Sequence, residues 1–490
     1  MGKSLFTKDY VYISVFISLF MLWSACNGVW SLLVPTDEIS GYHNALGEAF
    51  QHAQLSLLIE PSKELLSLAN PYDPAQNANF RLHDASLFEG KYYLYFSPVP
   101  TIIAFLPFHL VTNRYLPEAL LATIACLIGI FYLIRAAIFL YGEEKFNLFP
   151  RHTKNMLVIG FSILPGALYF LRRVLVYEST ISVGFMFTSI SFYLMLKIKK
   201  ELMSKHGVVS NFRLTQLGAS IGLMVWTRPN LIVYAVLFFI YTLFHIWQID
   251  HNRIIRIIVL VASPLLIATL MFAYNYARFN SITEFGTSYI LSGADIHGQP
   301  MFALRHIPIA LFGYLLTMPS YSFLFPFVRL NPQTLPAPID FNFSGEPLLG
   351  LAALPIFWIL LGQAVKFSKK WLKQNIELVI AFIGSLGTLM ILSLNLGTTG
   401  RYTLEFYPLF LLITYVVVIR AYALKISKDN QENTDYGGLI RALFCASVVI
   451  QFFASFTGYG DSFKRFSPNQ FLYLESIFQA PLALINRILG

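Results

Sequence analysis

The chain has little charge for its length. Only 12% of its 490 residues are Asp, Glu, Lys or Arg, about half of the roughly 25% that is usual in soluble domains. Hydrophobic residues make up 56% of the sequence. Such a chain cannot cover a soluble globule with charge, so the composition indicates a polytopic membrane protein.

Cysteine is also scarce. The three cysteines, Cys26, Cys126 and Cys445, all lie in apolar segments and form no Cys-x-x-Cys pair, so we expect buried small side chains rather than disulfides or metal ligands. A phosphate-cradling glycine loop, a His-Glu-x-x-His motif and an Asp-x-Asp pair are all missing from the sequence. The sequence therefore demands no cofactor and no divalent metal.

The net charge of +9 does not indicate nucleic-acid binding. The basic residues lie in short loops between apolar runs, where the positive-inside rule puts them. We therefore expect membrane lipids, and no nucleic acid, among the partners.

Apolar runs of the length that crosses a bilayer recur along the chain. They predict an all-α polytopic membrane protein, with 1–490 as a single membrane domain. Two further runs, 99–113 and 306–327, are rich in proline and aromatic residues and are expected to be re-entrant or interfacial. The eleven predicted spans are 10–33, 117–141, 155–173, 180–197, 214–227, 229–248, 254–275, 348–366, 375–394, 406–424 and 438–457.

An orientation with the N-terminus inside puts most basic residues in the cytoplasmic loops and most acidic residues outside, as the positive-inside rule requires. The predicted outer pieces are then 34–116, 276–347 and the C-terminal tail 458–490. Within that tail, 467–487 is amphipathic and is expected to lie on the membrane interface.

The acidic pair Asp37-Glu38 stands directly after the first predicted span. Residues 39–53 can form an amphipathic helix, so an acidic residue here could simply cap a helix start. Two adjacent carboxylates at the hydrocarbon boundary are costly unless they are used. Asp37 and Glu38 are therefore candidate catalytic residues.

A second candidate region is aromatic and framed by two charges, Asp84 and Lys91. A lysine near Tyr92, Tyr93 and Tyr95 suits a phosphate, because it offers a compact charge beside hydroxyl donors. The alternative is an interfacial lysine whose charge reaches the lipid headgroups.

Further charged candidates lie at the predicted outer ends of later spans. Glu178 falls in a very short turn, with Arg172 and Arg173 as possible salt-bridge partners. Three arginines could hold a phosphate through bidentate contacts, or could instead pair with acids in their own motifs. These arginines are Arg228, Arg278 (near Glu284) and Arg401 (beside Tyr402 and near Glu405).

Together these motifs resemble the GT-C superfamily of integral-membrane glycosyltransferases. The elements of the likeness are an acidic pair after the first span, a long outer loop, the Lys91-Tyr92-Tyr93-Leu94 segment, an acid in the next outer turn and Arg-Tyr near a late span. The branches resembled are the aminoarabinose lipid A transferase, the protein O-mannosyltransferases and the transferases that glucosylate O-antigen. The Lys-Pro-Pro-Leu-type segment of the family lacks its prolines here.

The resemblance implies a GT-C-like bundle, a polyprenyl-phosphate-sugar donor and a reaction on the non-cytoplasmic face. It also implies a bacterial inner membrane, with the active site and C-terminus periplasmic. Asp37 takes the place of the catalytic acid, Glu38 that of the following acid, Lys91 that of a lysine near the donor phosphate, and Glu178 that of a second acid. The residues expected to contact the sugar or the acceptor are Asp84, Tyr92, Tyr93, Tyr95, Glu178, Tyr402 and Glu405.

The expected reaction is a single displacement that inverts the anomeric carbon. Asp37 would take the proton of an acceptor hydroxyl on an envelope glycan, lipid or protein. Lys91, Arg228, Arg278 and Arg401 would stabilise the departing lipid phosphate in place of a metal.

Two rival functions remain open from the sequence. A transporter or flippase of a lipid-linked sugar would also combine many helices with a few charges, and a membrane assembly protein could use the outer loop to dock a partner. Glycosidic bond formation distinguishes the transferase from both.

Overall fold

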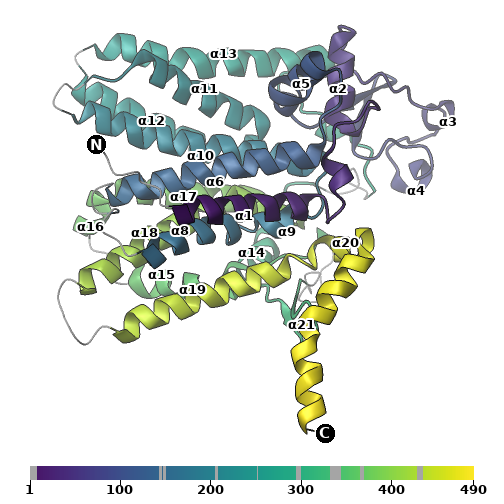
Figure 1. Cartoon of the computed structure of the whole chain (residues 1–490). Helices are drawn as coiled ribbons and strands as arrows, with labels where there is room; N and C mark the ends of the chain where they lie inside the picture. The colour runs from purple at the N-terminus through teal and green to yellow at the C-terminus, as the bar shows by residue number, and fades with distance from the viewer. Residues whose placement is uncertain are drawn as a thin grey trace. The chain divides into compact units, whose positions relative to one another are not determined.

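The computed structural model describes residues 8–489 except 143–145, 147–150, 205–207, 251, 294–299, 331–343, 365–368 and 427–433. The described residues form two compact units, and one of the four boundaries between them falls within a long helix, α6 (Glu118–Tyr141). Unit 1 comprises 1–33, 123–174 and 304–490, and unit 2 comprises 34–122 and 175–303. Helices predominate in both units (Figure 1).

Unit 2 combines four long helices with a smaller region of short elements, which gathers at one end of those helices (Figure 1). Its elements are α2 (Gly41–Gln51), α3 (Lys63–Leu66), α4 (Pro74–Asn77), β1 (Ala85–Phe88), β2 (Lys91–Leu94), the π-helix η2 (Thr101–Phe105), α5 (Leu106–Thr112), α10 (Val176–Leu202), α11 (Asn211–Thr227), η3 (Pro229–Leu231), α12 (Ile232–Ile249), α13 (Arg253–Phe279) and η4 (Thr287–Tyr289).

Unit 1 is also mainly helical. Its elements are α1 (Lys8–Ala25), η1 (Trp30–Leu33), α8 (Arg151–Ile163), α9 (Ala167–Phe170), η5 (Leu304–His306), α14 (Ile307–Leu316), β3 (Ser320–Tyr321), β4 (Val328–Arg329), β5 (Ser344–Gly345), η6 (Leu351–Ala353), α15 (Pro355–Ala364), α16 (Lys369–Gln374), α17 (Ile376–Ser393), β6 (Gly397–Thr398), η7 (Gly400–Glu405), α18 (Tyr407–Ile426), α19 (Thr434–Ala454), α20 (Gly458–Phe466) and α21 (Pro468–Leu489).

Each of the eleven predicted spans overlaps a helix, but their number as spans is not confirmed. Within the described part of the chain, five helices are long and apolar enough to cross a membrane, and a sixth is possible if a pair bent by 60° counts as one span. The bent pair is Gly438–Ala454 with Gly458–Phe466. The five helices are Glu118–Tyr141, Val176–Leu202, Pro229–Ile249, Arg253–Phe279 and Ile376–Ser393.

The proline-rich runs fold as short elements. The run 99–113 contains the π-helix η2 and α5, and 306–327 contains α14 and then strand β3. The helices of both runs, Thr101–Thr112 and Leu304–Leu316, are shorter than a span requires.

The description as purely helical needs one correction, because the described residues include three two-stranded sheets. The longest is the antiparallel hairpin β1–β2, in which Phe88 pairs with Lys91. Its turn residues Glu89 and Gly90 have φ of +48° and +72°, the left-handed pair that a tight hairpin needs. Alternating aromatic and aliphatic side chains suit such a strand, and this signal was missed beside the strong helical periodicity.

The region 34–116 has its own small core, which contains residues of α2, α3 and the β1–β2 hairpin. Leu46, Leu65, Ala85 and Leu94 are fully buried there, with Tyr92 packed among them. The predicted amphipathic helix at 39–53 is confirmed as α2. A folded region, rather than an extended loop, therefore carries the candidate residues.

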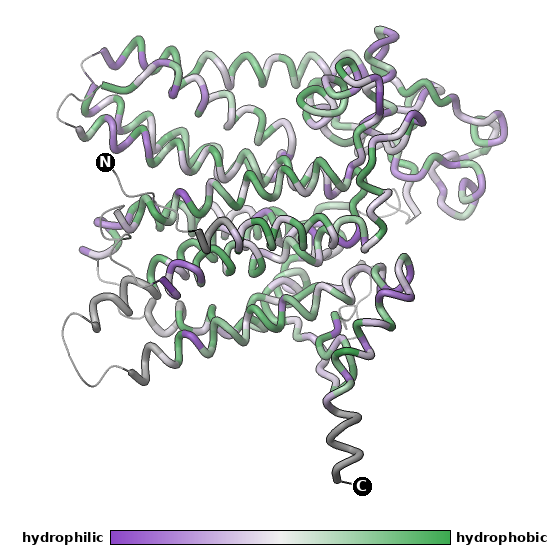
Figure 2. The backbone as a smooth tube through the Cα atoms, viewed as in Figure 1, coloured by the Kyte–Doolittle hydropathy of each residue, from purple (hydrophilic) through white to green (hydrophobic). Residues whose placement is uncertain are grey.

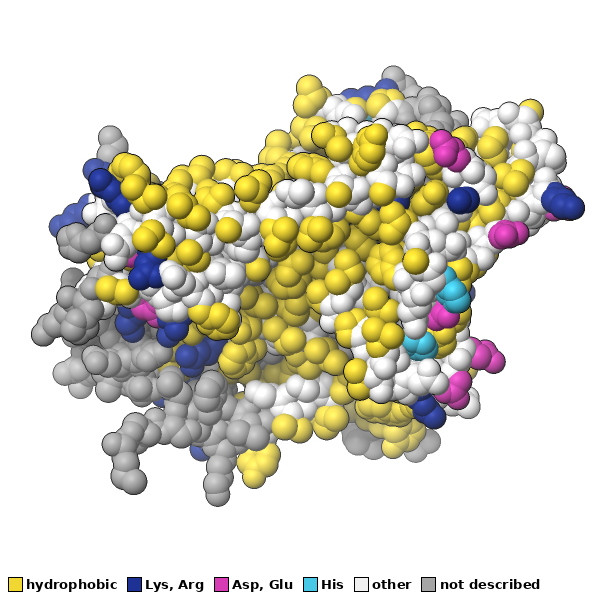
Figure 3. All heavy atoms as spheres, turned by 90° about the horizontal axis from the view of Figure 1, so that it is seen from above, with side chains coloured by type: hydrophobic (Ala, Val, Ile, Leu, Met, Phe, Trp, Pro, Cys, Tyr) yellow, Lys and Arg dark blue, Asp and Glu magenta, His cyan; other side chains and the backbone are white. Residues whose placement is uncertain are grey.

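Helices α10 to α13 pack together, and α11 contacts both α10 and α13. Most of the apolar length of α13 is exposed, as expected for a helix that faces lipid. Figure 2 shows hydrophobic residues along the middle of these helices and hydrophilic residues towards their ends and in the α3–α4 region. On the face in Figure 3, hydrophobic side chains fill the middle, Lys and Arg occur at both ends, and the visible His side chains lie at the end where most of the visible Asp and Glu lie.

A close approach of α11 and α13 gives a test of this packing. A Cβ added to Gly218 would lie 2.5 Å from the Leu260 carbonyl oxygen and 2.8 Å from Pro264 Cδ, whereas Gly362 on α15 has open space. We expect Gly218→Ala to lower the free energy of unfolding by about 1–3 kcal/mol, because the helices must separate. Gly362→Ala should be neutral or stabilising, since Ala is the better helix former.

Thermal unfolding of both variants in detergent measures the difference. Equal melting temperatures for Gly218→Ala and the wild type would contradict the close packing of α11 on α13.

Candidate functional site

The first turn of α2 connects several separate segments of unit 2. Asn44 Nδ2 donates to the Leu116 carbonyl oxygen at 2.9 Å, just before α6 begins. Tyr42 Oη donates to the His83 carbonyl oxygen, just before the β1–β2 hairpin. A Cβ on Gly41 would lie 2.6 Å from Glu118 Oε1, and its φ of +76° also favours glycine. This turn therefore joins the hairpin to the start of α6.

Carboxyl groups from distant parts of the chain interact with Tyr42 and with one another. Asp84 and Glu118 both act electrostatically on Tyr42, and Glu178 acts on Glu118. Burial of Tyr42, followed by the charge of Asp84, raises the pKa of Tyr42 to about 12. We call Tyr42, Asp84, Glu118 and Glu178 the carboxylate cluster.

Each carboxyl of the cluster has a defined setting. Asp84 has a φ of +59°, and its side chain is 14% exposed and lies 3.3 Å from His83 Nε2. Glu178 is fully buried and lies in the first turn of α10, where its Oε2 accepts the Leu175 amide at 3.0 Å. Glu178 thus contributes to the N-terminal cap of a helix, which favours a carboxylate at that place. Glu118 stands in the first turn of α6, with an acidic charge at the helix start.

A buried histidine fastens this turn to two other elements. His43 Nδ1 lies 3.0 Å from Thr101 Oγ1, and Nε2 lies 3.3 Å from Thr180 Oγ1. Because Thr180 donates its own proton to the Val176 carbonyl, His43 Nε2 must be the donor in its bond with Thr180. Burial lowers the pKa of His43 to about 3, so the ring is neutral and acts as a structural link.

Asp37 and Glu38 lie outside the carboxylate cluster. The N-cap of α2 is Ser40, so capping does not explain the acidic pair. The Asp37 side chain is 80% exposed, and its Oδ1 lies 3.5 Å from Arg114 Nε. Glu38 is exposed as well. Asp37 is therefore open to a substrate, and its catalytic role stays a prediction.

Lys91 opens strand β2 and is exposed, while Tyr92 and Tyr93 are buried. Strand alternation puts Tyr92 on the opposite face from Lys91 and Tyr93 on the same face. Tyr92 packs in the core, and Tyr93 contacts Phe279 with the ring centroids 5.4 Å apart. Tyr95 packs on Phe96. Phosphate binding by Lys91 stays a prediction.

The arginines of unit 2 lie in different surroundings. Arg278 is buried, and it donates to the Leu94 carbonyl at 2.7 Å and to Asn275 Oδ1 at 2.9 Å. Its guanidinium lies 4.0 Å from the Tyr274 ring centroid. Arg278 therefore fastens strand β2 to α13. Arg228 is half-buried at the end of α11, and its Cγ packs against Gly184 of α10.

Glu284 acts electrostatically on Arg278, and it also accepts the Gly286 amide at 2.6 Å and the Ser288 hydroxyl at 2.7 Å. In unit 1, Arg401 Nη2 lies 3.3 Å from Glu346 Oε1, so these two residues form an ion pair.

The remaining candidates of unit 1 surround Arg401. Glu405 is buried, Tyr402 is half-buried, and the guanidinium of Arg401 lies 5.9 Å from the Tyr402 ring centroid. Tyr169 Oη donates to the Gly400 carbonyl at 3.0 Å and fixes the turn before these residues. Arg401, Tyr402 and Glu405 belong to unit 1, so they are described apart from the carboxylate cluster.

Unit 1 also contains a buried arginine that is not among the candidate site residues. Arg172 is fully buried, its Nε donates to the Ser455 carbonyl at 2.9 Å, and its guanidinium lies 4.5 Å from the Trp23 ring centroid and 4.6 Å from that of Phe463. Aromatic faces stabilise such a cation.

Tyr42 and Glu118 are functional candidates that sequence reasoning missed. Glu118 follows Pro117 at the start of an apolar run, within the predicted span 117–141. In the described residues, no group of three or more His, Cys, Asp or Glu is arranged to hold a metal ion.

A solved structure resembles the fold of this chain. No protein-family model and no curated protein matches the sequence. The neighbour is a crystal structure of ArnT from Cupriavidus metallidurans bound to undecaprenyl phosphate. The match has a TM-score of 0.43 and 11% identity, and it covers 95% of this chain and 79% of that chain.

ArnT is a GT-C glycosyltransferase, the superfamily that the sequence motifs resemble. With a TM-score below 0.5, the similarity by itself assigns neither a fold nor an activity to this chain.

The burial of neutral His43 predicts a pH dependence of stability. The histidine takes up a proton near pH 6.5 when the chain is unfolded, but only near pH 3 when it is folded. The stability is thus complete above pH 6.5 and is lost as the pH falls. Between pH 7 and pH 5 the loss should be on the order of 2 kcal/mol.

Thermal unfolding of His43→Gln at pH 7 and pH 5 tests this expectation, since glutamine does not titrate. We expect a smaller pH effect in this variant than in the wild type. His152→Gln, at an exposed position, is the control and should keep the full effect. An unchanged pH dependence in His43→Gln would show that His43 does not cause it.

Proposed function

We propose that the protein is a GT-C-like glycosyltransferase that moves a sugar from a polyprenyl-phosphate donor to a hydroxyl group on the outer face of a bacterial inner membrane. The acceptor is an envelope glycan, a lipid or a protein. The proposal joins the membrane-spanning helices to the acidic groups that gather at one end of unit 2.

The carboxylate cluster is the observation that carries the proposal. Asp84 follows a loop, Glu118 begins α6 and Glu178 begins α10, yet Asp84 and Glu118 both act on Tyr42, and Glu178 acts on Glu118. Carboxylates and a phenol hydroxyl are suited to bind the many hydroxyl groups of a sugar. Holding several acids together beside apolar helices is costly unless a ligand uses them, so a polar, hydroxylated substrate fits this place.

Asp37 is the proposed general base. It would take the proton from the acceptor hydroxyl while the acceptor oxygen forms a bond with the anomeric carbon. The bond between that carbon and the donor phosphate oxygen breaks in the same step, so the configuration inverts. The exposure of Asp37 leaves its carboxylate accessible to such an acceptor.

The leaving group is a lipid phosphate, on which negative charge accumulates. Lys91 at the exposed start of β2 is the proposed partner of this charge. Arg228 is a second candidate, since its side chain is only half-buried at the end of α11. Arg278 is less suited to this role, because two of its nitrogens already hold the backbone and Asn275.

A transfer assay on the purified protein in lipid vesicles tests the proposal. A labelled polyprenyl-phosphate sugar is supplied with envelope extract, and new glycosidic products are identified by mass spectrometry. We expect product with the wild type and a loss of about 100-fold or more with Asp37→Asn, which removes the base. Glu38→Gln should reduce transfer less strongly.

Glu64→Gln is the matched control, because Glu64 is an exposed acid on α3 of the same unit. This variant should retain wild-type transfer. Full activity in both Asp37→Asn and Glu38→Gln would exclude the general-base role. Movement of the lipid-linked sugar across the vesicle membrane without any new glycosidic bond would instead identify a transporter.

A further inference from the structure

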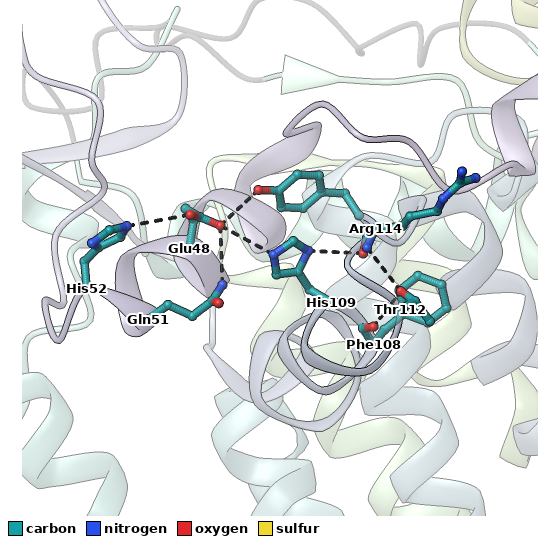
Figure 4. Close-up of polar contacts among 8 residues, drawn as sticks. Glu48, Gln51, His52, Phe108, His109, Thr112 and Arg114 are labelled. Carbon is teal, nitrogen blue, oxygen red and sulfur yellow. Dashed lines mark hydrogen bonds and ion pairs between the residues drawn. The ribbon is translucent and has the colours of Figure 1, made fainter.

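Glu48 lies at the centre of a polar network that the candidate residues do not include. Its Oε2 accepts a hydrogen bond from Tyr115 Oη at 2.9 Å and one from Gln51 Nε2 at 3.3 Å (Figure 4). His109 Nε2 lies 3.9 Å from the same oxygen, and His52 Nε2 lies 3.7 Å from Oε1. The network thus links α2 to α5 and to the segment that follows α5.

The dipeptide Arg114-Tyr115 is held from several directions. Thr36 and Tyr115 exchange two backbone hydrogen bonds, of 3.3 and 2.8 Å. The His109 ring stacks on the Tyr115 ring, with centroids 4.4 Å apart and an interplanar angle of 11°. His109 Nδ1 lies 3.3 Å from the Arg114 carbonyl oxygen. A carbonyl only accepts, so Nδ1 is the donor and the ring orientation is defined.

This dipeptide in turn holds the segment that contains Asp37. Thr36, the direct neighbour of Asp37, is the residue in the backbone bridge, and Arg114 Nε makes the ion pair with Asp37 Oδ1 at 3.5 Å. The exposed carboxylate has little side-chain packing to set its direction. Its position therefore depends on Arg114 and Tyr115.

The hydrogen bond between Tyr115 and Glu48 lies in largely buried surroundings. The Tyr115 residue is buried, and burial, together with its hydrogen bond to Glu48, raises the pKa of the Tyr115 hydroxyl. The Glu48 side chain is only 22% exposed. A hydrogen bond between a phenol and a carboxylate in such surroundings is stronger than one in water.

We propose that Glu48, His109 and Tyr115 are positioning residues for the transfer reaction, which hold Arg114 and thereby set the direction of the Asp37 carboxylate. We call these three residues the Tyr115 clamp. They act through Arg114 and do not touch the substrate. The proposal rests on the proposed function, because it assigns Asp37 as the base.

A clamp of this kind affects the reaction step more than substrate binding. A base that is displaced by a fraction of an ångström loses its alignment with the acceptor hydroxyl. The donor still binds, because the proposed phosphate partners lie elsewhere. The expected signature is therefore a lower kcat with an unchanged KM for the donor.

Tyr115→Phe is the sharpest test, because it removes only the hydroxyl that Glu48 accepts and keeps the stacked ring. We expect kcat to fall about tenfold or more, while the donor KM stays within about twofold of the wild-type value. Amide hydrogen exchange of residues 34–40 should become faster. Tyr473→Phe, at an exposed tyrosine of α21, is the matched control. It should change neither the kinetic constants nor the amide exchange of residues 34–40.

A second pair of variants works even if Tyr115→Phe does not fold. The Arg114 side chain is 53% exposed, so its replacement should leave the core intact. Arg114→Ala should lose kcat as Tyr115→Phe does, whereas Arg114→Lys keeps a cation beside Asp37 and should recover part of the loss. Equal activities of the Ala and Lys variants would overturn the proposal.

The exchange measurement separates this proposal from the proposed function. Unchanged exchange of residues 34–40 in Tyr115→Phe would show that the clamp does not hold Asp37. Faster exchange with unchanged kcat would show that holding Asp37 does not matter to transfer, which also overturns the proposal. A wild-type protein that transfers no sugar would overturn the proposed function, while the exchange result would still decide whether Tyr115 holds the segment.

Discussion

The need to give every buried polar group a partner is the constraint on which the structure of unit 2 depends. An apolar chain has few such groups, and desolvating one without a partner is costly. The first turn of α2 collects several of them: His43 binds Thr101 and Thr180, and Asn44 binds the Leu116 carbonyl. Through these bonds one helical turn joins the hairpin, η2, α6 and α10.

The same constraint separates structural charges from candidate functional ones. Arg172 and Arg278 are buried against aromatic rings and donate to backbone carbonyls, so their charges serve packing. Asp37 and Lys91, by contrast, remain exposed. The carboxylate cluster lies between these extremes, because it contains both a fully buried Glu178 and a partly accessible Asp84. We expect the accessible charged residues to take part in the chemistry. We expect the buried ones to hold the fold and to contribute to the electrostatic field around the site.

Sequence reasoning succeeded where one strong periodic signal decided the structure. The helices at the predicted spans and the amphipathic α2 follow from apolar runs and their period. It failed at β1–β2, because four-residue strands give a weak signal, and at Glu118, because one acid at the start of an apolar run looks like a flank. Asp84 and Glu178 were named as candidates, but nothing in their local sequence shows that they are connected through Tyr42 and Glu118.

The sequence by itself determined the class of the protein: a helical membrane chain, with its helix positions and its acidic residues beside the first span. These properties depend on composition and on contacts within one helix, and both can be read from the order of residues along the chain. The tertiary structure decided which residues meet. It brought Asp84, Glu118 and Glu178 together, placed Tyr115 between Glu48 and Thr36, and paired Arg401 with Glu346. These contacts depend on how segments that are far apart in the sequence pack together. Because desolvating a polar group without a partner is costly, the buried polar groups pair with partners that the packing brings within hydrogen-bonding distance.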